Sequence, residues 1–106
     1  MSNTDVNVSK ASIDDFQSDG VVVLRNVFTP WVEGVCKAIE QNKRNPSWRE
    51  RTYQPEEGSG SEFFQDYCVW SKFSGYRELV TSSPMARIAA QLMRSRTARI
   101  FHDHVL

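Results

Sequence analysis

The last ten residues, 97–106, read TARIFHDHVL and constrain the fold more than any other stretch. Apolar and polar residues alternate there, which is typical of a β-strand whose successive side chains point to opposite faces. One face carries two histidines between two apolar residues: Ile100, His102, His104 and Leu106. The other face carries Phe101, Asp103 and Val105. Such a strand suits the wall of a polar cavity, and its backbone donors and acceptors need a neighbouring strand. We therefore expect the 106 residues to be the opening section of a larger enzyme fold.

Composition limits the classes of protein and partner. A chain of 106 residues allows one small domain, and 40% hydrophobic with 25% charged residues is typical of a soluble globular protein. The 13 basic and 13 acidic residues balance, which argues against nucleic acid as a partner. The longest apolar run, 21–24, is far too short to span a membrane, and residues 1–10 lack the pattern of a secretory signal. We expect a cytoplasmic protein without a membrane partner, in which Cys36 and Cys68 are buried free thiols.

The N-terminal third is predicted to be a flexible tail, a short helix and a buried strand. Residues 1–10 are polar and expected to be flexible, and the domain is expected to cover residues 11–106. Ser12 is predicted to cap the helix, which ends at Gly20 because glycine readily adopts a positive φ. The β-branched run 21–24 that follows is predicted to be a strand covered on both faces.

The next part of the chain is predicted to be an amphipathic helix and a long loop. Thr29 and Pro30 are a capping hydroxyl and a first-turn proline, and the helix is expected to end at Asn45. Residues 46–62 form the loop, with two prolines and two glycines. A basic and aromatic group beside it could face an anionic substrate; the alternative is a solvated loop anchored by one tryptophan. This group is Arg44, Trp48, Arg49 and Arg51.

Apolar periodicity predicts two more helices before the final strand. Residues 63–70 fit either a strand or an extended connector, and residues 73–80 suggest a short helix. A further helix is expected to start at Ser83 and Pro84 and to end near Ser95. Its apolar face holds Met85, Ile88, Ala89, Leu92 and Met93, a pattern more typical of core than of a cofactor site.

The histidine pair is the one cluster of metal-ligand residue types. Two histidines two positions apart on a strand, His102 and His104, could bind a metal together, but the sequence contains no third histidine. Asp103 points to the opposite face of a regular strand, and HDH is not the HxD motif of a 2-His-1-carboxylate iron site. We therefore predict no metal ligand and no catalytic residue in this chain, and cavity-lining or structural histidines instead. No phosphate-binding loop or activated nucleophile is evident.

Three segments resemble the start of the phytanoyl-CoA dioxygenase family of Fe(II)- and 2-oxoglutarate-dependent oxygenases. They are FQSDGVVVLRNVFT (16–29), SPMARIAAQLM (83–93) and ARIFHDHVL (98–106), in that order. The resemblance implies an α+β fold: the N-terminal helices and first strands of a double-stranded β-helix, or jelly roll, incomplete in this chain. It implies Fe(II) and 2-oxoglutarate as cofactors of a full-length member, with iron ligands later than Leu106, and neither cofactor bound tightly by this chain alone. The face of His102 and His104 would look toward a small-molecule substrate or 2-oxoglutarate.

Two alternatives stay open. The chain could be a non-catalytic interaction module or oligomer that pairs its open strand edge with a partner. It could also be a small dimer that binds a metal through His102 and His104 of both copies. The first alternative requires a stable complex, and the second requires metal binding that depends on the histidines.

Overall fold

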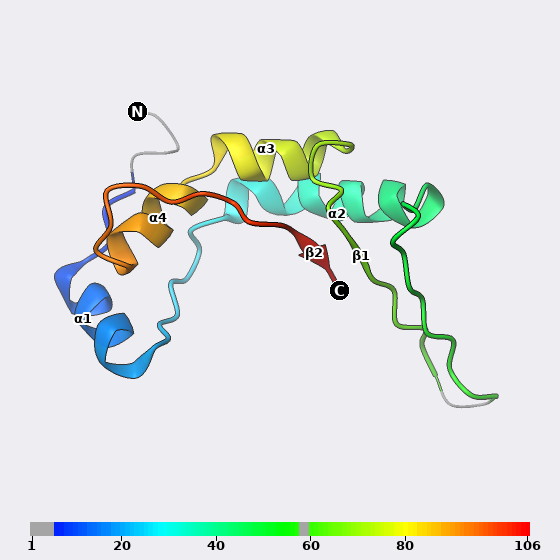
Figure 1. The fold of residues 1–106 in the computed structure, drawn as a ribbon, viewed down its shortest axis with the longest axis horizontal. Coiled ribbons are helices and arrows are strands. Elements are labelled where there is room, and N and C mark those ends of the chain that lie inside the picture. The colour runs from blue at the N-terminus through cyan, green and yellow to red at the C-terminus, as the bar shows by residue number, and fades with distance from the viewer. Residues whose placement is uncertain (1–5, 58–59) are drawn as a thin grey trace.

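The computed structural model describes residues 6–57 and 60–106. Within these residues, four helices and two short strands follow in the order α1 (Lys10–Asp19), α2 (Thr29–Arg44), β1 (Asp66–Tyr67), α3 (Ser74–Ser82), α4 (Met85–Leu92) and β2 (His104–Val105). Helices α2 and α3 lie side by side in the middle, α1 and α4 at one end, and a hairpin at the other (Figure 1). The final segment runs from α4 across the middle to β2, which pairs antiparallel with β1 (Figure 1).

The expected α+β fold with the first strands of a jelly roll is wrong for these residues. The described part is mostly helical, and its one sheet joins Asp66 with Val105 and Tyr67 with His104. Residues 21–24, predicted to be a buried strand, form no strand, and Val21 and Val23 are 65% and 69% exposed. β-branched residues favour extended chain, but a strand exists only where a second strand supplies the hydrogen bonds. Of the two predicted strands, 21–24 and 97–106, only residues 104–105 pair with another strand of the described chain.

The N-cap of helix α1 lies three residues before the predicted one. The hydroxyl of Ser9 accepts a hydrogen bond from the backbone N–H of Ser12 at 3.1 Å, so Ser9 is the N-cap and the assignment to Ser12 is wrong. The predicted end is confirmed, because Gly20 has φ 78° and its N–H bonds to the carbonyl of Phe16 at 2.8 Å. Here the left-handed backbone explains the glycine.

Helix α2 has the predicted bounds to within a residue, but its N-cap differs from the predicted one. Pro30 lies in its first turn as expected, yet the N-cap is Phe28, which offers no side-chain cap. The hydroxyl of Thr29 bonds to the carbonyl of Asn26 instead, so its predicted capping role is wrong. The helix ends before Asn45, as predicted.

The core lies where α2 crosses α3, and it is small. Its buried apolar residues are Ala38, Val69 and Tyr76, and the half-buried ones packed on them are Val35, Ile39, Trp70, Phe73 and Val105. Gly75 permits the close crossing, since a Cβ there would lie 2.0 Å from the carbonyl oxygen of Gly34. The backbones of the two helices thus approach in a way that no side chain at Gly75 would allow.

The predicted loop 46–62 folds into part of a hairpin. Tyr53 and Phe63 exchange two backbone hydrogen bonds at 2.8 and 2.9 Å, and Arg51 and Gln65 exchange two at 3.0 and 3.2 Å. Trp48 is 80% exposed and lies against the guanidinium of Arg49, 4.6 Å from the ring centroid. Trp48 therefore does not anchor the loop. Such an anchor was part of the alternative interpretation, in which the basic and aromatic group does not face an anionic substrate.

At the opposite end, side chains join α1 and the residues before it to α4 and the residues after it. Gln91 accepts a hydrogen bond from the N–H of Val8 at 2.9 Å and donates one to the carbonyl of Val6 at 2.8 Å. Asp14 and Arg94 form an ion pair at 2.9 Å. Of the tail predicted to be flexible, residues 1–5 lie outside the described residues, whereas Val6 and Val8 have these contacts.

The structure also tests the prediction for the two cysteines and the expectation about membrane spans. Cys36 and Cys68 are free thiols, as expected, but both are exposed, so the prediction of burial is wrong. None of the described helices has both the length and the apolar character needed to cross a membrane.

Candidate functional site

The final segment forms one side of an apolar cleft whose other walls are α2, α3 and the start of α4. The cleft has a volume of ≈ 420 Å³. Its apolar lining comprises Val35, Ile39, Trp70, Tyr76, Leu79, Val80, Met85, Ile100, Val105 and Leu106. Its polar lining comes from three consecutive residues, His102, Asp103 and His104. The cleft therefore suits an apolar group that ends in a polar one.

The predicted alternation of the segment is present, although most of it is not paired as a strand. Asp103 and Val105 are half-buried, and Val105 packs on the core, whereas His102, His104 and Leu106 are exposed. All five line the cleft, so the two faces are less separated than a regular strand predicts. Both histidines reach the cleft from the exposed face.

Asp103 fixes the segment against the chain that follows β1. Its carbonyl accepts a hydrogen bond from the N–H of Cys68 at 3.0 Å, and its Oδ2 accepts one from the N–H of Val69 at 3.1 Å. Its Oδ1 is buried without a partner among the described residues. Because Asp103 lies between the two histidines, these bonds determine where both imidazoles lie.

The two imidazoles have different surroundings. Nε2 of His104 lies 3.1 Å from Oε1 of Gln65, and its ring lies 5.3 Å from that of Tyr67. The ring of His102 packs edge-on against Phe101, with centroids 5.0 Å apart. The His104 ring is thus oriented by Tyr67 of β1 and by Gln65, the residue before β1. The His102 ring is oriented by Phe101, which is itself 95% exposed.

A buried polar network under the cleft was not predicted from the sequence. The carboxylate of Asp66 accepts hydrogen bonds from Asn42 Nδ2 at 3.0 Å, from the N–H of Ser47 at 2.7 Å and from the Ser47 hydroxyl at 2.5 Å. The N–H of Tyr67 donates a fourth at 2.9 Å. Tyr76 joins the network by donating its hydroxyl to Asn42 Oδ1 at 3.1 Å. The sequence did contain a signal that Asn42 is buried, because Asn42 lies one turn after Ala38 and therefore on the same face of α2.

The network shifts the pKa of both of its ionisable groups. Burial raises the pKa of Asp66, but the hydrogen bonds from Ser47, Asn42 and Tyr67 outweigh it, and the net pKa is lowered. Burial, together with the negative charges of Asp66 and Asp103, raises the pKa of Tyr76 to about 12. Asp66 is thus held as a carboxylate and Tyr76 as a neutral donor. The pair acts as a scaffold for the cleft.

The described residues do not bring together enough ligands for a metal ion. Within residues 6–57 and 60–106, no three His, Cys, Asp or Glu side chains lie close enough to hold a metal ion. The residues present therefore do not fit an iron site by themselves.

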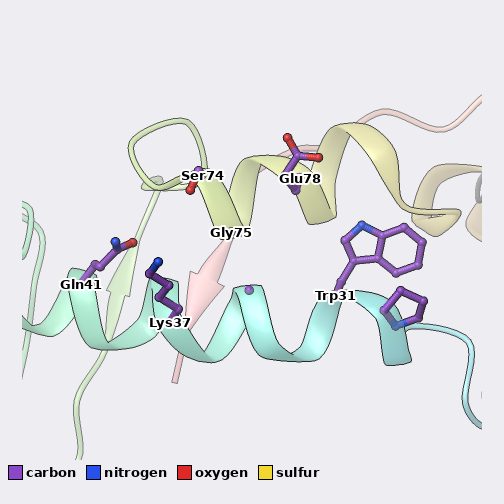
Figure 2. Close-up of a pocket in the computed structure, with 8 residues that line it drawn as sticks. Trp31, Lys37, Gln41, Ser74, Gly75 and Glu78 are labelled. Carbon is purple, nitrogen blue, oxygen red and sulfur yellow. The ribbon is translucent and has the colours of Figure 1, made fainter.

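A second, more polar cleft lies at the α2–α3 crossing. It has a volume of ≈ 310 Å³, and its floor is the close approach of Gly34 and Gly75. Figure 2 shows Lys37 and Gln41 projecting from α2 toward the α3 side, with Trp31 near the start of α2 and Glu78 on α3. This cleft is smaller and has fewer apolar side chains in its lining, so the apolar cleft with the histidine segment remains the better candidate site.

Comparisons with protein-family models, with curated proteins and with solved structures found no match to this chain.

Proposed function

We propose that this chain is the N-terminal section of an Fe(II)- and 2-oxoglutarate-dependent dioxygenase of the phytanoyl-CoA dioxygenase type. In such enzymes iron and 2-oxoglutarate supply the oxidising chemistry that hydroxylates a substrate C–H bond. The proposal rests on the resemblance of residues 16–29, 83–93 and 98–106. The observation that carries it furthest is the position of His102 and His104 at the polar end of an apolar cleft.

The role of this chain's residues in that function is to bind and orient. The apolar walls from α2 and α3 exclude water from the apolar part of a substrate. His102 and His104 offer hydrogen bonds to a polar group at the end of the cleft, and Asp103 holds both in place. No step through iron is assigned to these residues, because they do not form a metal site.

The test uses the protein isolated from its natural source. We expect its intact mass to exceed 12.2 kDa, and we expect it to convert 2-oxoglutarate to succinate when Fe(II) is added. In that protein, His102→Ala or His104→Ala should raise the KM for an apolar substrate more than either lowers kcat, because both histidines bind rather than react. The matched control is Arg77→Ala, an exposed change on α3 outside both clefts. A protein without any 2-oxoglutarate turnover contradicts the proposal.

A second candidate is a non-catalytic interaction module. The open edge of β2 favours it, since among the described residues β2 pairs with β1 alone. A native protein that has no turnover and is always recovered with a second polypeptide supports this candidate over the first.

A further inference from the structure

The edge segment, residues 96–106, has backbone groups without hydrogen-bond partners. In the described chain, residues 98–102 make no backbone–backbone hydrogen bond, and the carbonyl of Asp103 is the first group to accept one. From there β2 is bonded along one edge and open along the other. An extended segment with free N–H and C=O groups is a template for another strand.

The edge segment also borders a broad apolar surface. Ile100 and Leu106 are 46% and 73% exposed. The ≈ 420 Å³ cleft shares Val35, Leu79 and Met85 with a second apolar cleft of ≈ 270 Å³ that reaches Phe28. We call the surface formed by these two clefts and the edge segment the apolar face. A soluble chain rarely leaves such a continuous apolar surface without an interaction role.

The size of the exposed surface fits an interface. The described shape has a radius of gyration of 16.3 Å, whereas a compact domain of this length has about 13 Å. Its accessible surface is 7923 Å², whereas a compact monomer of 12.2 kDa has about 6,100 Å². The difference, about 1,800 Å², exceeds the roughly 800 Å² that each partner buries in a standard stable interface. This excess covers the whole molecule, including the projecting hairpin, and the apolar face is one part of it (Figure 1).

Charge selects the kind of partner. Arg96 and Arg99 are exposed and have no ion pair in the described chain, while Arg94 is paired with Asp14. Asp103 is the one acidic side chain in residues 94–106, and it is half-buried and bonded to Val69. The edge is thus cationic. A second copy paired along this segment would offer these arginines no free carboxylate, because its one acid, Asp103, is bonded to Val69, and this disfavours a second copy as the occupant.

We propose that the edge segment docks an extended strand of a separate polypeptide in which apolar residues alternate with acidic ones. The strand adds to the free edge of residues 98–106, its apolar side chains cover the apolar face on the side of Ile100, and its carboxylates lie on the other side with Arg99, while Arg96 adds positive charge just before the edge. This inference names the partner of the interaction module and rests on that second candidate function. It does not depend on oxygenase activity.

The test is a titration of the 106-residue chain with labelled eight-residue peptides, followed by fluorescence anisotropy. A peptide of alternating valine and glutamate is expected to bind, and one of alternating valine and lysine at least about tenfold more weakly. A valine–glutamate peptide with N-methylated amides on one edge should lose binding, because it cannot complete the strand ladder. Amide exchange of residues 98–105 should slow only with the unmodified acidic peptide.

Variants of the chain separate charge at the edge from charge elsewhere. Arg96→Glu with Arg99→Glu should reverse the peptide preference, so that the lysine peptide binds better. Lys43→Glu with Arg44→Glu is the matched control, since it makes the same charge change at exposed positions far along α2 and should leave the preference unchanged.

Equal binding of both peptides to the natural chain, or tight binding of the N-methylated one, overturns the proposal. Micromolar self-association of the chain alone also overturns it, by assigning the face to a second copy. None of these outcomes bears on 2-oxoglutarate turnover, so the oxygenase proposal stands or fails separately.

Discussion

Polar groups are bonded differently in two regions of the molecule. One is the buried hydrogen-bond network of Asn42, Ser47, Asp66, Tyr67 and Tyr76, which we call the junction, and the other is the edge segment. At the junction, Asp66 accepts four hydrogen bonds and Tyr76 donates to Asn42, all in a buried setting. Along the edge segment, residues 98–102 leave their backbone groups unbonded by other backbone groups of the described chain, and Phe101 is 95% exposed. Buried polar groups cost free energy unless they are hydrogen-bonded within the protein, whereas exposed ones can hydrogen-bond to water or to a partner. The junction therefore stabilises this chain, and the edge segment is available for binding.

The largest expected effect tests the helix crossing that supports the junction. Gly75→Ala places a Cβ 2.0 Å from the carbonyl oxygen of Gly34 and 3.0 Å from the Cβ of Ala38, so α2 and α3 must separate. We expect a loss of about 3 kcal/mol in the free energy of unfolding, measured by urea denaturation. Gly34→Ala is the control, because its Cβ would meet Gly75 at an ordinary 3.8 Å and the helix should gain up to about 1 kcal/mol. Equal effects of the two changes contradict the close crossing.

The next effect tests the buried carboxylate. Asp66→Asn keeps the shape but replaces one acceptor oxygen by a donor that faces the donors of Ser47 or Asn42. We expect about 2 kcal/mol of lost stability, since a buried donor is left without an acceptor. The same measurement on Asp19→Asn, an exposed acid at the end of α1, should show little change. A neutral Asp66→Asn would mean that the network contributes nothing to stability.

Acid should weaken the junction in a defined pH window. Because the folded pKa of Asp66 is lowered from 3.8, its contribution is complete above that pH and is lost as pH falls through the folded value. The free energy of unfolding should therefore drop below about pH 4, and Asp66→Asn should flatten that slope. Hydrogen bonding to Lys10 also lowers the pKa of exposed Asp14. Asp14→Asn should leave most of the slope intact, and the opposite ranking of the two variants contradicts the assignment.

A smaller effect tests the tyrosine hydroxyl. Tyr76→Phe removes the hydrogen bond to Asn42 Oδ1 and should cost about 1 kcal/mol. The natural chain should also lose stability as pH rises from 10.0 to about 12, because the folded pKa of Tyr76 is raised and its stabilisation is complete only below the unfolded value. Tyr76→Phe should lack that decline, whereas Tyr53→Phe, an exposed hairpin position, should keep it. Ultraviolet titration of the phenols provides the independent check.

The smallest effect is predicted for the edge segment. Phe101→Ser removes a large apolar side chain, yet stability should change by less than about 0.5 kcal/mol, because the ring is already exposed. Val69→Ser is the contrasting variant, since Val69 is fully buried in the core and its loss should cost roughly 2 kcal/mol or more. If Phe101→Ser destabilised the isolated chain as much as Val69→Ser, the edge segment would be part of the core and unavailable to a partner.

Local sequence signals predicted the helices well because their causes are local. Pro30 and Asn45 marked the ends of α2, and Gly20 ended α1 through a left-handed φ of 78°. The N-caps at Ser12 and Thr29 were wrong, because Ser9 accepts the N–H of Ser12 and so caps the helix three residues earlier, and because the Thr29 hydroxyl donates to the carbonyl of Asn26. Single hydrogen bonds between near neighbours decide such details, and several choices have similar energies.

The strands and the polar core could not be predicted with the same success. Residues 21–24 have the composition of a strand but no partner, and residues 97–106 gain one only at His104 and Val105. Asp66 looked like an ordinary polar residue, although its partners Asn42 and Ser47 lie 24 and 19 positions away. Pairing and burial across such distances are properties of the packed chain.

The sequence by itself determined the helices, the extended and alternating character of residues 97–106, and the pairing of two histidines with an acid between them. Periodicity and special residues specify these features through interactions within a few positions. Only the tertiary structure decided that Asp103 turns toward Val69 while His102 and His104 reach an apolar cleft, and that the core is centred on the Gly75 crossing. The physical reason is that burial and strand pairing depend on which distant segments come together, and no local pattern specifies that choice.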